Sequence, residues 1–405
     1  MEIPIITLPG GDLSVDELIQ EMLQAVRRVL GMQVAFVSEF NEGRRVFRYV
    51  DSDRSFSPVQ VGQWDPLNAS YCQLVVDGKL PELIYDARRE PTVQHLAATH
   101  ELPVGAHLSV PIRFSGGEVY GTFCCFSQHP DETLNQRDLS ALRLFAGFAA
   151  RVLERRSAQE QFRRCARERV QKVLAEQQFS ILYQPIINVA LNRLVGHEAL
   201  ALFHPQPKRS PDKWFFEAHQ AGLGEELELM LVARALEGLA AFPADSYISI
   251  NLSPETIIGG RLEEVLKRHD LNRIVLEVTE HTSVSDYADI ARHLAGLRRR
   301  GLKLAVDDAG AGFASFRHIL KLNPDIIKLD ASLIQKIDLD KPSRALAAAL
   351  IRFAEEIGSK VVAEGVETES ELAVLRELKV SKAQGYLLGR PAALDECLDT
   401  TRWGP

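Results

Sequence analysis

Polar side chains stand at or near the ends of short apolar runs in the second half of the chain. They are Glu198, Asn251, Glu277, Asp307, Asp308, Lys328 and Glu364. Five of them are carboxylates, which would repel one another if they met unless cations neutralised them. None is Cys or His, so these hard oxygen ligands suit Mg²⁺ or Mn²⁺ better than zinc. We therefore expect a metal site, in which the adjacent Asp307 and Asp308 could bridge or divide two ions, as in phosphoryl displacement.

Each of these residues also has an ordinary structural interpretation. A single carboxylate at a strand end is usually a helix cap or a solvated loop residue, and Lys328 could simply neutralise a neighbouring acid. That interpretation is weakest for Glu277 and for Asp307-Asp308, because an acid in an otherwise apolar strand costs free energy unless it is paired or metal-bound. The recurrence of the pattern over several strands favours one shared site.

The elements that must position these residues have the order of a β/α barrel, because short apolar runs alternate with helical stretches from Phe179 onward. Eight strands are predicted, at 180–184, 194–200, 247–252, 274–278, 302–307, 326–329, 360–363 and 382–385. Helices are predicted between some of them, at 225–239, 286–299 and 343–357. The carboxyl ends of barrel strands converge on one face, where active sites are built. We expect the polar side chains to meet there.

The first part of the chain has an α+β pattern. Ser14 and Glu17 have capping-box spacing at the start of an amphipathic helix over 14–30. Strands are predicted at 34–40, 108–112 and 119–126, with Gly116-Gly117 supplying a turn between the last two. Helical periodicity returns at 139–153.

A polar stretch over 151–172 follows and is predicted to be a helical connector rather than a flexible linker. Apolar residues near one seven-residue seam would allow a coiled coil, namely Phe145, Phe148, Val152, Phe162, Ala166 and Val173. Arg155, Gln159 and Arg169 interrupt that seam. A polar connecting helix and a dimer stalk are both compatible with this pattern.

Composition and charge narrow the class of protein. A formal net charge of -8 over 405 residues argues against general nucleic-acid binding, which needs a broad basic surface, but allows a small anionic ligand held by metals. No apolar run approaches the ~20 residues that cross a bilayer, and residues 1–10 lack the features of a secretory signal, so we expect a cytoplasmic protein without a membrane segment. The five cysteines form no C-x-x-C pair, and we expect reduced thiols.

The segment over about 179–398 resembles the EAL family of cyclic di-GMP phosphodiesterases. The motifs that carry this resemblance occur in the family's order: Tyr183-Gln-Pro-Ile186, Glu198-Ala-Leu200, Asn251-Leu-Ser253, Glu277-Val-Thr-Glu280, Asp307-Asp308, Lys328-Leu-Asp330, Ala363-Glu-Gly-Val-Glu367 and Gln384-Gly-Tyr386. The resemblance implies a TIM-like α/β barrel of the EAL type and metal-dependent hydrolysis of cyclic di-GMP to linear pGpG.

The resemblance also implies a role for each matched residue. One metal ion would be bound by Glu198, Asn251, Glu277 and Asp307, and a second by Asp307, Asp308 and Glu364. Glu364 would be the general base, and Lys328 would hold the water or a phosphate. Gln184, Leu200, Glu367 and Gln384 are expected near the substrate. Glu280 would brace the loop over 309–316, which in the family is thought to link metal binding with dimerisation.

Two positions depart from the family's pattern. Family members usually carry Arg two residues beyond the Glu-Ala-Leu tripeptide, where it contacts a substrate phosphate, but this chain has Leu202. Loss of a charge-assisted contact would cost on the order of 1.5–3 kcal/mol, or roughly ten- to a hundredfold in affinity. The loop also has Ala309 where the family often has Phe, which would alter its packing.

The segment over about 12–155 resembles GAF domains, most clearly in His107-Leu-Ser-Val-Pro-Ile112 and Val119-Tyr-Gly-Thr-Phe-Cys-Cys-Phe126. GAF domains commonly hold small molecules, so an unidentified ligand is expected here. Possible pocket residues are Tyr71, Cys72, Asp86, His95 and His107. Cys72 is expected to be a packed thiol rather than a chromophore attachment site, because free Cys is so often buried.

These observations predict three segments: an α+β GAF-like sensor domain over 12–155, a helical connector over 156–178 and an EAL domain over 179–400. The leading hypothesis is a metal-dependent phosphodiesterase that the GAF-like domain regulates, in a chain that forms a homodimer. The alternative, motivated by Leu202, is a weakly active or inactive module that acts as a cyclic di-GMP receptor or a protein-interaction domain.

Overall fold

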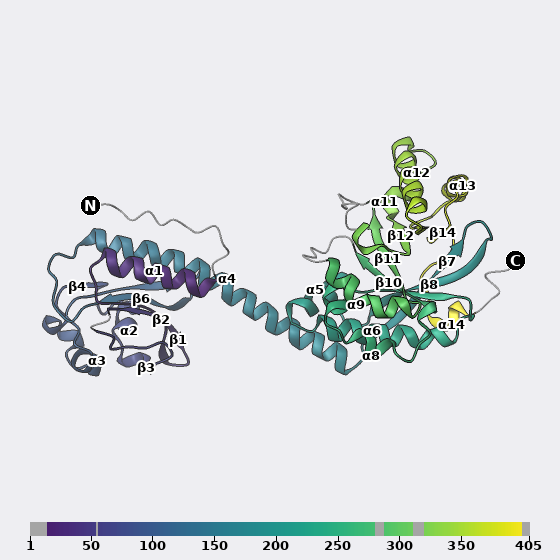
Figure 1. The fold of residues 1–405 in the computed structure, drawn as a ribbon. Helices are drawn as coiled ribbons and strands as arrows, with labels where there is room; N and C mark the ends of the chain where they lie inside the picture. The colour runs from purple at the N-terminus through teal and green to yellow at the C-terminus, as the bar shows by residue number, and fades with distance from the viewer. Residues whose placement is uncertain (1–13, 54–55, 280–286, 311–319, 399–405) are drawn as a thin grey trace. The chain divides into compact units, whose positions relative to one another are not determined.

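The computed structural model describes residues 14–53, 56–279, 287–310 and 320–398, and it divides into two compact units over 1–162 and 163–405. Figure 1 shows the elements of both units. Within the described residues, every helix is too short or too polar to cross a lipid bilayer.

The first unit is built on a six-stranded antiparallel sheet in the order β3-β2-β1-β6-β5-β4. Its strands are β1 (Val34–Asn41), β2 (Arg44–Ser52), β3 (Trp64–Pro66), β4 (Leu83–Ile84), β5 (His107–Arg113) and β6 (Val119–Phe126). Its helices are α1 (Val15–Val29), α2 (Tyr71–Val76), α3 (Ala97–Glu101) and the start of α4 (Gln136–Ala175), with short 3-10 turns at Leu67–Ala69, Ala87–Arg89 and Pro91–Val93. The α+β prediction for this segment is confirmed.

The sheet of the first unit is covered on both faces. On one face α1 and α4 pack onto residues such as Val37 and Phe123, and on the other α2 and the loops pack onto Phe36 and Phe126. The capping box predicted at Ser14 and Glu17 is present at the start of α1.

The strand predictions for the first unit were incomplete. The three predicted strands correspond to β1, β5 and β6, but β2, β3 and β4 were missed. β2 is polar along most of its length and only half-buried, so its sequence lacks an apolar run, while β3 and β4 have only three and two residues.

The second unit is a closed eight-stranded barrel, in the order β10-β11-β12-β13-β14-β7-β8-β9. Its strands are β7 (Phe179–Asn188), β8 (Arg193–Phe203), β9 (Tyr247–Asn251), β10 (Ile274–Thr279), β11 (Lys303–Ala309), β12 (Ile326–Leu329), β13 (Lys360–Ala363) and β14 (Lys382–Ala383). The barrel of the TIM-like prediction is confirmed.

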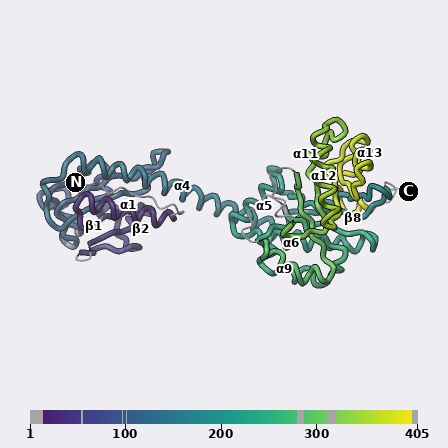
Figure 2. Tube along the Cα trace, turned by 45° about the horizontal axis from the view of Figure 1, so that its top comes forward, coloured from purple at the N-terminus to yellow at the C-terminus, as the bar shows by residue number. Residues whose placement is uncertain are grey.

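Helices pack against the strands of the barrel in one apolar core, and Figure 2 follows the course of the chain through them. They are α5 (Pro211–Gln220), α6 (Gly224–Glu237), α7 (Pro254–Ile258), α8 (Leu262–Leu266), α9 (Tyr287–Arg299), α11 (Ala331–Ile334), α12 (Lys341–Glu356), α13 (Glu369–Glu377) and α14 (Leu394–Cys397), with 3-10 turns at Gly238–Ala240 and Leu271–Arg273. The large apolar core of this unit lies between helices and strands.

The first strand of the barrel runs against its neighbours. β7 pairs antiparallel with both β14 and β8, whereas β8 to β14 pair in parallel. Only four residues separate β7 from β8, and a connection that short can form a hairpin but not a parallel crossover. The barrel therefore differs from an all-parallel one at this strand.

The connector predicted over 156–178 lies mostly within a single helix, α4, which begins at Gln136 and ends at Ala175. Its first part contributes Leu142 and Ala146 to the core of the first unit, and its last part contributes Val170 and Val173 to the core of the second. The predicted coiled-coil seam is therefore not free over its whole length, because Val173 is buried in its own unit.

A buried carboxylate on α5 offers a test of the packing of α4 in the second unit. The Nε and Nη2 atoms of Arg169, on α4, each donate a hydrogen bond to a carboxylate oxygen of Glu217, with N···O distances of 3.0 Å. Arg209 also pairs with this carboxylate. The hydrogen bond from Arg209 is the main cause that holds the pKa of Glu217 below its ordinary value, and Arg169 lowers this pKa further.

Glu217→Gln should lower the free energy of unfolding at pH 7 by about 1–2 kcal/mol, because two guanidinium groups lose their charged acceptor. A depressed folded-state pKa stabilises above the unfolded value of 4.5 and is lost as the pH falls through the folded value. In urea unfolding experiments, the difference from wild type should therefore shrink as the pH falls below 4.5 and disappear below the folded-state pKa. The control is Glu237→Gln. Glu237 forms an exposed ion pair with Arg234, so this change should have little effect on the free energy of unfolding. A Glu217→Gln deficit that persists unchanged at acid pH would contradict this account.

Candidate metal and phosphodiester site

The inside of the barrel has an apolar layer and, next to it, a polar layer. The apolar layer consists of Ile186, Val275, Ala305, Ile326 and Val362. Side chains alternate along a strand, so the next residue on the same face lies two positions away. Two positions beyond the apolar residues of the parallel strands stand Glu277, Asp307, Lys328 and Glu364. In antiparallel β7 the order is reversed, and Gln184 precedes Ile186 by two.

Lys328 lies at the centre of the polar layer. Its side chain is 1% exposed, and its Nζ atom lies close to four carboxylates. The distances are 2.7 Å to Glu277, 2.7 Å to Glu364, 3.3 Å to Asp307 and 3.4 Å to Glu198. One ammonium group therefore faces four acids, which leaves negative charge for further cations to neutralise.

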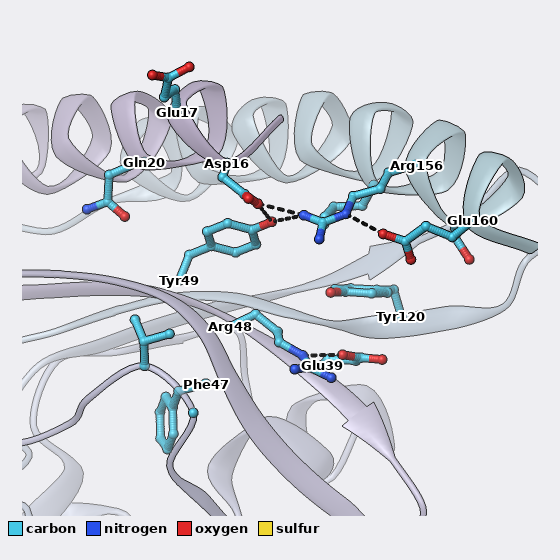
Figure 3. A pocket seen from close by; sticks show the side chains of 14 residues that line it. Asp16, Glu17, Gln20, Glu39, Phe47, Arg48, Tyr49, Tyr120, Arg156 and Glu160 are labelled. Atoms are coloured by element: carbon cyan, nitrogen blue, oxygen red, sulfur yellow. Dashed lines mark hydrogen bonds and ion pairs between the residues drawn. The ribbon is translucent and has the colours of Figure 1, made fainter. Parts of the chain in front are cut away.

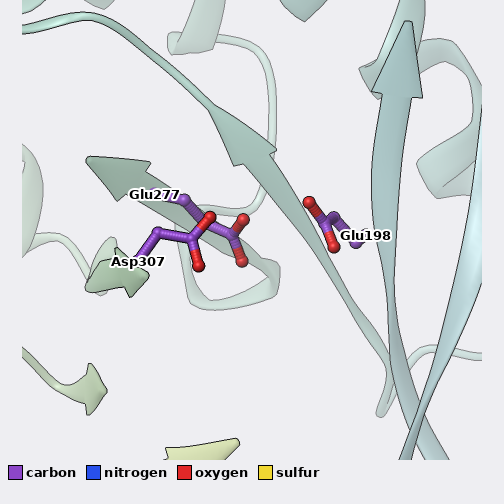
Figure 4. Close-up of side chains that lie close together, drawn as sticks. All are labelled: Glu198, Glu277 and Asp307. Atoms are coloured by element: carbon purple, nitrogen blue, oxygen red, sulfur yellow. The ribbon is translucent and has the colours of Figure 1, made fainter. Parts of the chain in front are cut away.

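The acids form two groups that share one member. Oxygen atoms of Glu198, Glu277 and Asp307 lie within 4.8 Å of one another, as do those of Asp307, Asp308 and Glu364. Figure 4 shows the first group, with side chains from three different strands directed toward a common region. A donor set made only of carboxylate oxygens, in two groups that share a ligand, fits a pair of hard divalent cations.

Adjacent Asp307 and Asp308 both reach this region because the backbone is irregular there. Neighbouring side chains on a regular strand point to opposite faces. Asp308 has a φ of 58°, and the pairing of β11 with β12 shifts register between Val306 and Ala309. A left-handed backbone is uncommon for a residue other than Gly, and such residues concentrate at functional sites.

The protonation of the cluster depends on burial and on Lys328. Burial, reinforced by neighbouring acids, raises the pKa of Glu364 to about 8 against the opposing charge of Lys328. Burial likewise raises the pKa of Glu277. Burial alone would raise the pKa of Glu198, but Lys328 and two amide donors outweigh it and hold the pKa low. Lys328 keeps its charge because the carboxylates raise its pKa against the effect of burial.

Amide side chains continue the site on one side of the cluster. Gln384 Nε2 donates to Glu198 at 2.6 Å and to Gln184 Oε1 at 2.9 Å, and Asn251 Nδ2 donates to Glu198 at 2.9 Å. The Oε1 atom of Gln384 is buried without a hydrogen-bond partner among the described residues. Gln184 in turn donates to the carbonyl of Gly389 at 3.1 Å.

The other residues expected near the substrate are less buried than Gln184 and Gln384. Leu200 and Leu202 lie two and four positions beyond Glu198 on the same face of β8, toward the strand's carboxyl end, and Leu202 is 41% exposed. Glu367 is exposed before α13, and its backbone N–H donates to the Glu371 carboxylate at 2.9 Å. Its side chain has no hydrogen bond or ion pair to the acidic cluster within the described part of the chain. Glu280 and most of the loop over 309–316 lie outside the described residues.

Ser249 belongs to the site but was not predicted from the sequence. Its hydroxyl donates to Glu277, and the residue is buried. Ser249 and Asn251 stand two positions apart in β9, so the inward face that supplied Asn251 also supplies a hydroxyl donor. That period of two was the signal available in the sequence.

The possible pocket residues of the first unit are only partly brought together. Tyr71 and His107 line a small cavity of about 20 Å³ with Arg45, and Cys72 accepts from Arg45 nearby. Asp86 caps the 3-10 turn Ala87–Arg89 and His95 is exposed; neither lines that cavity.

A larger hollow of about 790 Å³ lies elsewhere on the first unit, beside α1, β2 and α4 (Figure 3). Tyr49 donates to Asp16 at 2.6 Å, and Arg156 donates to both Asp16 and Tyr49. The charged groups in this hollow are therefore largely paired with one another.

Each of the two units matches the model of a known domain family. The model of the EAL domain matches residues 167–391, and the model of the GAF domain matches residues 12–154. The chain belongs to the EAL family and carries a GAF domain N-terminal to its EAL domain.

Relatives of the chain include proteins with and without a stated activity. An uncharacterized signaling protein of Caulobacter vibrioides is 31% identical over 71% of this chain and 38% of its own length. The cyclic di-GMP phosphodiesterase NbdA of Pseudomonas aeruginosa is 31% identical over 58% of this chain and 32% of its own. The chain thus spans about a third of the length of these relatives. Among solved structures, the PaMucR phosphodiesterase in complex with c-di-GMP is similar at a TM-score of 0.52 and 28% identity, over 56% of this chain and 97% of that one.

The central position of Lys328 predicts a stability effect that metal should offset. Lys328→Met leaves four carboxylates without their ammonium partner, which should lower stability by about 3–5 kcal/mol in buffer with chelator. Adding Mn²⁺ should raise the melting temperature of this variant by more than it raises that of wild type, measured by scanning calorimetry.

The control is Lys382→Met. Lys382 is also half-buried in the barrel, but it contacts Tyr247 rather than the acids. Equal responses of both variants to Mn²⁺, or an undiminished stability of Lys328→Met in chelator, would contradict the arrangement described above.

Proposed function

We propose that the chain hydrolyses one phosphodiester of cyclic di-GMP to give linear pGpG, with two divalent ions, Mg²⁺ or Mn²⁺, bound by the barrel. The observation that carries this proposal is the pair of carboxylate groups that share Asp307. Two bound ions would supply charge stabilisation for the attacking and leaving oxygens of the phosphodiester and lower the pKa of a water molecule. Membership of the EAL family and the named activities of relatives support the same reaction.

The ligands are assigned from the two groups. Glu198, Asn251, Glu277 and Asp307 would hold one ion, and Asp307, Asp308 and Glu364 the other. Asn251 reaches this set because its amide lies 2.9 Å from Glu198, and rotation of that amide would present its oxygen instead. Ser249 would hold Glu277 in position by its hydroxyl.

Two residues would handle protons and charge. Glu364, whose pKa is raised by burial, would accept the proton of the attacking water at its carboxylate. Lys328 Nζ, held between Glu277 and Glu364 at 2.7 Å from each, would donate hydrogen bonds to the water or to a phosphate oxygen. Gln184 and Gln384 would line the path of the substrate beside Glu198.

Turnover of cyclic di-GMP by the full chain tests this function directly. With Mg²⁺ or Mn²⁺ the product should be pGpG, resolved by chromatography. Glu198→Ala and Asp307→Ala should each lower the rate by at least about a thousandfold, because each removes a ligand on which charge stabilisation depends. Glu237→Ala, an exposed acid outside the barrel, is the matched control and should leave the rate unchanged. Turnover that survives both ligand changes would contradict the assignment.

The second candidate function is a receptor that binds cyclic di-GMP with little or no hydrolysis. The observation that favours it is Leu202, an exposed aliphatic side chain on the same face of β8 as Glu198, where the family usually carries Arg. The two functions share the carboxylate cluster and differ in how firmly the phosphate is held.

Leu202→Arg distinguishes the two functions. If the missing phosphate contact limits the site, this change should tighten cyclic di-GMP binding by about ten- to a hundredfold and raise turnover. The control is Leu191→Arg, which adds the same charge to an exposed position in the turn at the other end of the same hairpin. Binding that does not respond to Leu202→Arg would show that another residue supplies the contact.

We further propose that the segments over 12–155 and 156–178 act as sensor and connector. α4 supports this proposal because one helix contributes core residues to both units. An unidentified small molecule bound to the GAF domain, or the arrangement of two chains in a homodimer, would then set the activity of the EAL domain. Leu144 and Phe148 are exposed apolar residues on α4 that a second chain would cover.

A further inference from the structure

Two cysteines far apart in the sequence face each other inside the first unit. Cys72 lies on α2 and Cys124 on β6, and both are fully buried. Their sulfur atoms are 3.5 Å apart. Neither residue contributes to the proposed phosphodiesterase site.

The two thiols have opposite surroundings. Arg45 donates from its Nη1 atom to the Cys72 sulfur at 3.1 Å, while its Nε atom donates to Asp65 at 2.9 Å. Arg45 is itself only 4% exposed, so its charge acts on the sulfur with little screening by solvent. The Cys124 sulfur instead contacts the hydroxyls of Thr122 at 3.1 Å and Ser109 at 3.0 Å.

These surroundings favour a thiolate on Cys72 and a thiol on Cys124. Burial by itself raises the pKa of Cys72, but the hydrogen bond from Cys124 and the charge of Arg45 outweigh it and lower the pKa. Burial and the neighbouring Cys72 raise the pKa of Cys124. A guanidinium beside a thiol lowers the pKa of that thiol and so increases the fraction of nucleophilic thiolate, whereas a thiol buried in apolar surroundings is inert.

A small, mostly apolar cavity lies beside Arg45, the residue that donates to Cys72. It has a volume of about 20 Å³, and its lining includes Arg45, His107 and Tyr71, the residue before Cys72. A cavity of this size admits about one water-sized molecule. The Nδ1 atom of His107, a residue 3% exposed, is buried without a partner among the described residues. Burial lowers the pKa of His107 to about 3, so the ring is neutral and can accept from an O–H group.

We propose that Cys72 is a peroxide-reactive thiol and that Cys124 is its resolving partner. The Cys72 thiolate attacks one oxygen of hydrogen peroxide, the O–O bond breaks, and the departing hydroxide takes a proton to leave as water. The resulting sulfenic acid is attacked by the Cys124 sulfur, which loses its proton as the second water leaves and a disulfide forms. Two thiols and one peroxide thus give one disulfide and two waters.

Formation of this disulfide would change the contacts of Arg45. A neutral disulfide sulfur is a weaker acceptor than a thiolate, so the buried Nη1–H group would lose its charged partner. Arg45 lies on β2 and pairs with Asp65 on β3, so the change would be felt at the edge of the sheet.

The test treats the full chain with a few equivalents of hydrogen peroxide and follows the intact mass, free thiols after denaturation, and peptides digested without reductant. We expect the loss of two hydrogen masses and a cross-linked peptide that joins Cys72 to Cys124. Cys72→Ser and Cys124→Ser should each abolish the cross-link. The matched control is Cys125→Ser, which changes the next residue of β6, a buried thiol in the core on the opposite face of the sheet. It should still form the link.

Arg45→Gln tests the cause of the reactivity. Without the guanidinium, the rate of reaction with peroxide should fall by about tenfold or more, because less of the thiolate forms. Circular dichroism checks that each variant is folded. If a variant does not fold, the intact mass and the cross-linked peptide of the wild-type chain still test whether Cys72 and Cys124 form a disulfide. Wild-type protein that keeps Cys72 and Cys124 reduced while peroxide oxidises the partly exposed Cys165 or Cys397 would overturn the proposal. An unchanged rate in folded Arg45→Gln would also overturn it.

Discussion

The charge enclosed by the barrel is the constraint on which the arrangement of the second unit depends. Four carboxylates surround the buried ammonium group of Lys328, and each comes from a different strand or strand end. Acids at this depth are costly unless cations compensate them, so the strands must bring them to one place and in register. The layer of Val275, Ala305, Ile326 and Val362 directly beside them fixes that register by apolar packing. The residues that pack the inside of the barrel and the charged residues beside them therefore lie on the same strands, two positions apart.

The barrel and most of the polar residues inside it could be predicted from the sequence, because short apolar runs that end in polar residues recur along the second half of the chain. An apolar run that ends in Glu277 or Asp307 has few structural interpretations, and the period of two places these acids inside. The sequence could not predict the left-handed backbone at Asp308, which depends on local pairing with β12. The antiparallel direction of β7 could have been inferred from the short turn before β8. In the first unit, β2 was missed because its burial comes from tertiary packing rather than from an apolar run.

The barrel and the GAF domain each contain a group of buried polar side chains. In the barrel, the carboxylates of Glu198, Glu277, Asp307, Asp308 and Glu364 form two groups that share Asp307, and the exposed Leu202 lies on the same face of β8 as Glu198. In the GAF domain, Arg45, Cys72 and Cys124 form a buried group, and none of these three residues lines the larger hollow beside α1. α4 contributes Leu142 and Ala146 to the core of the first unit and Val170 and Val173 to the core of the second.

We propose that the two carboxylate groups, which share Asp307, hold two divalent ions. The most direct measurement is an anomalous difference map of crystals grown with Mn²⁺, recorded above and below the manganese absorption edge. The account predicts two peaks about 3.5–4 Å apart, one next to Glu198 and Glu277, the other next to Asp308 and Glu364, with Asp307 between them. A single peak, or manganese bound elsewhere while Lys328 keeps all four carboxylates, would contradict it.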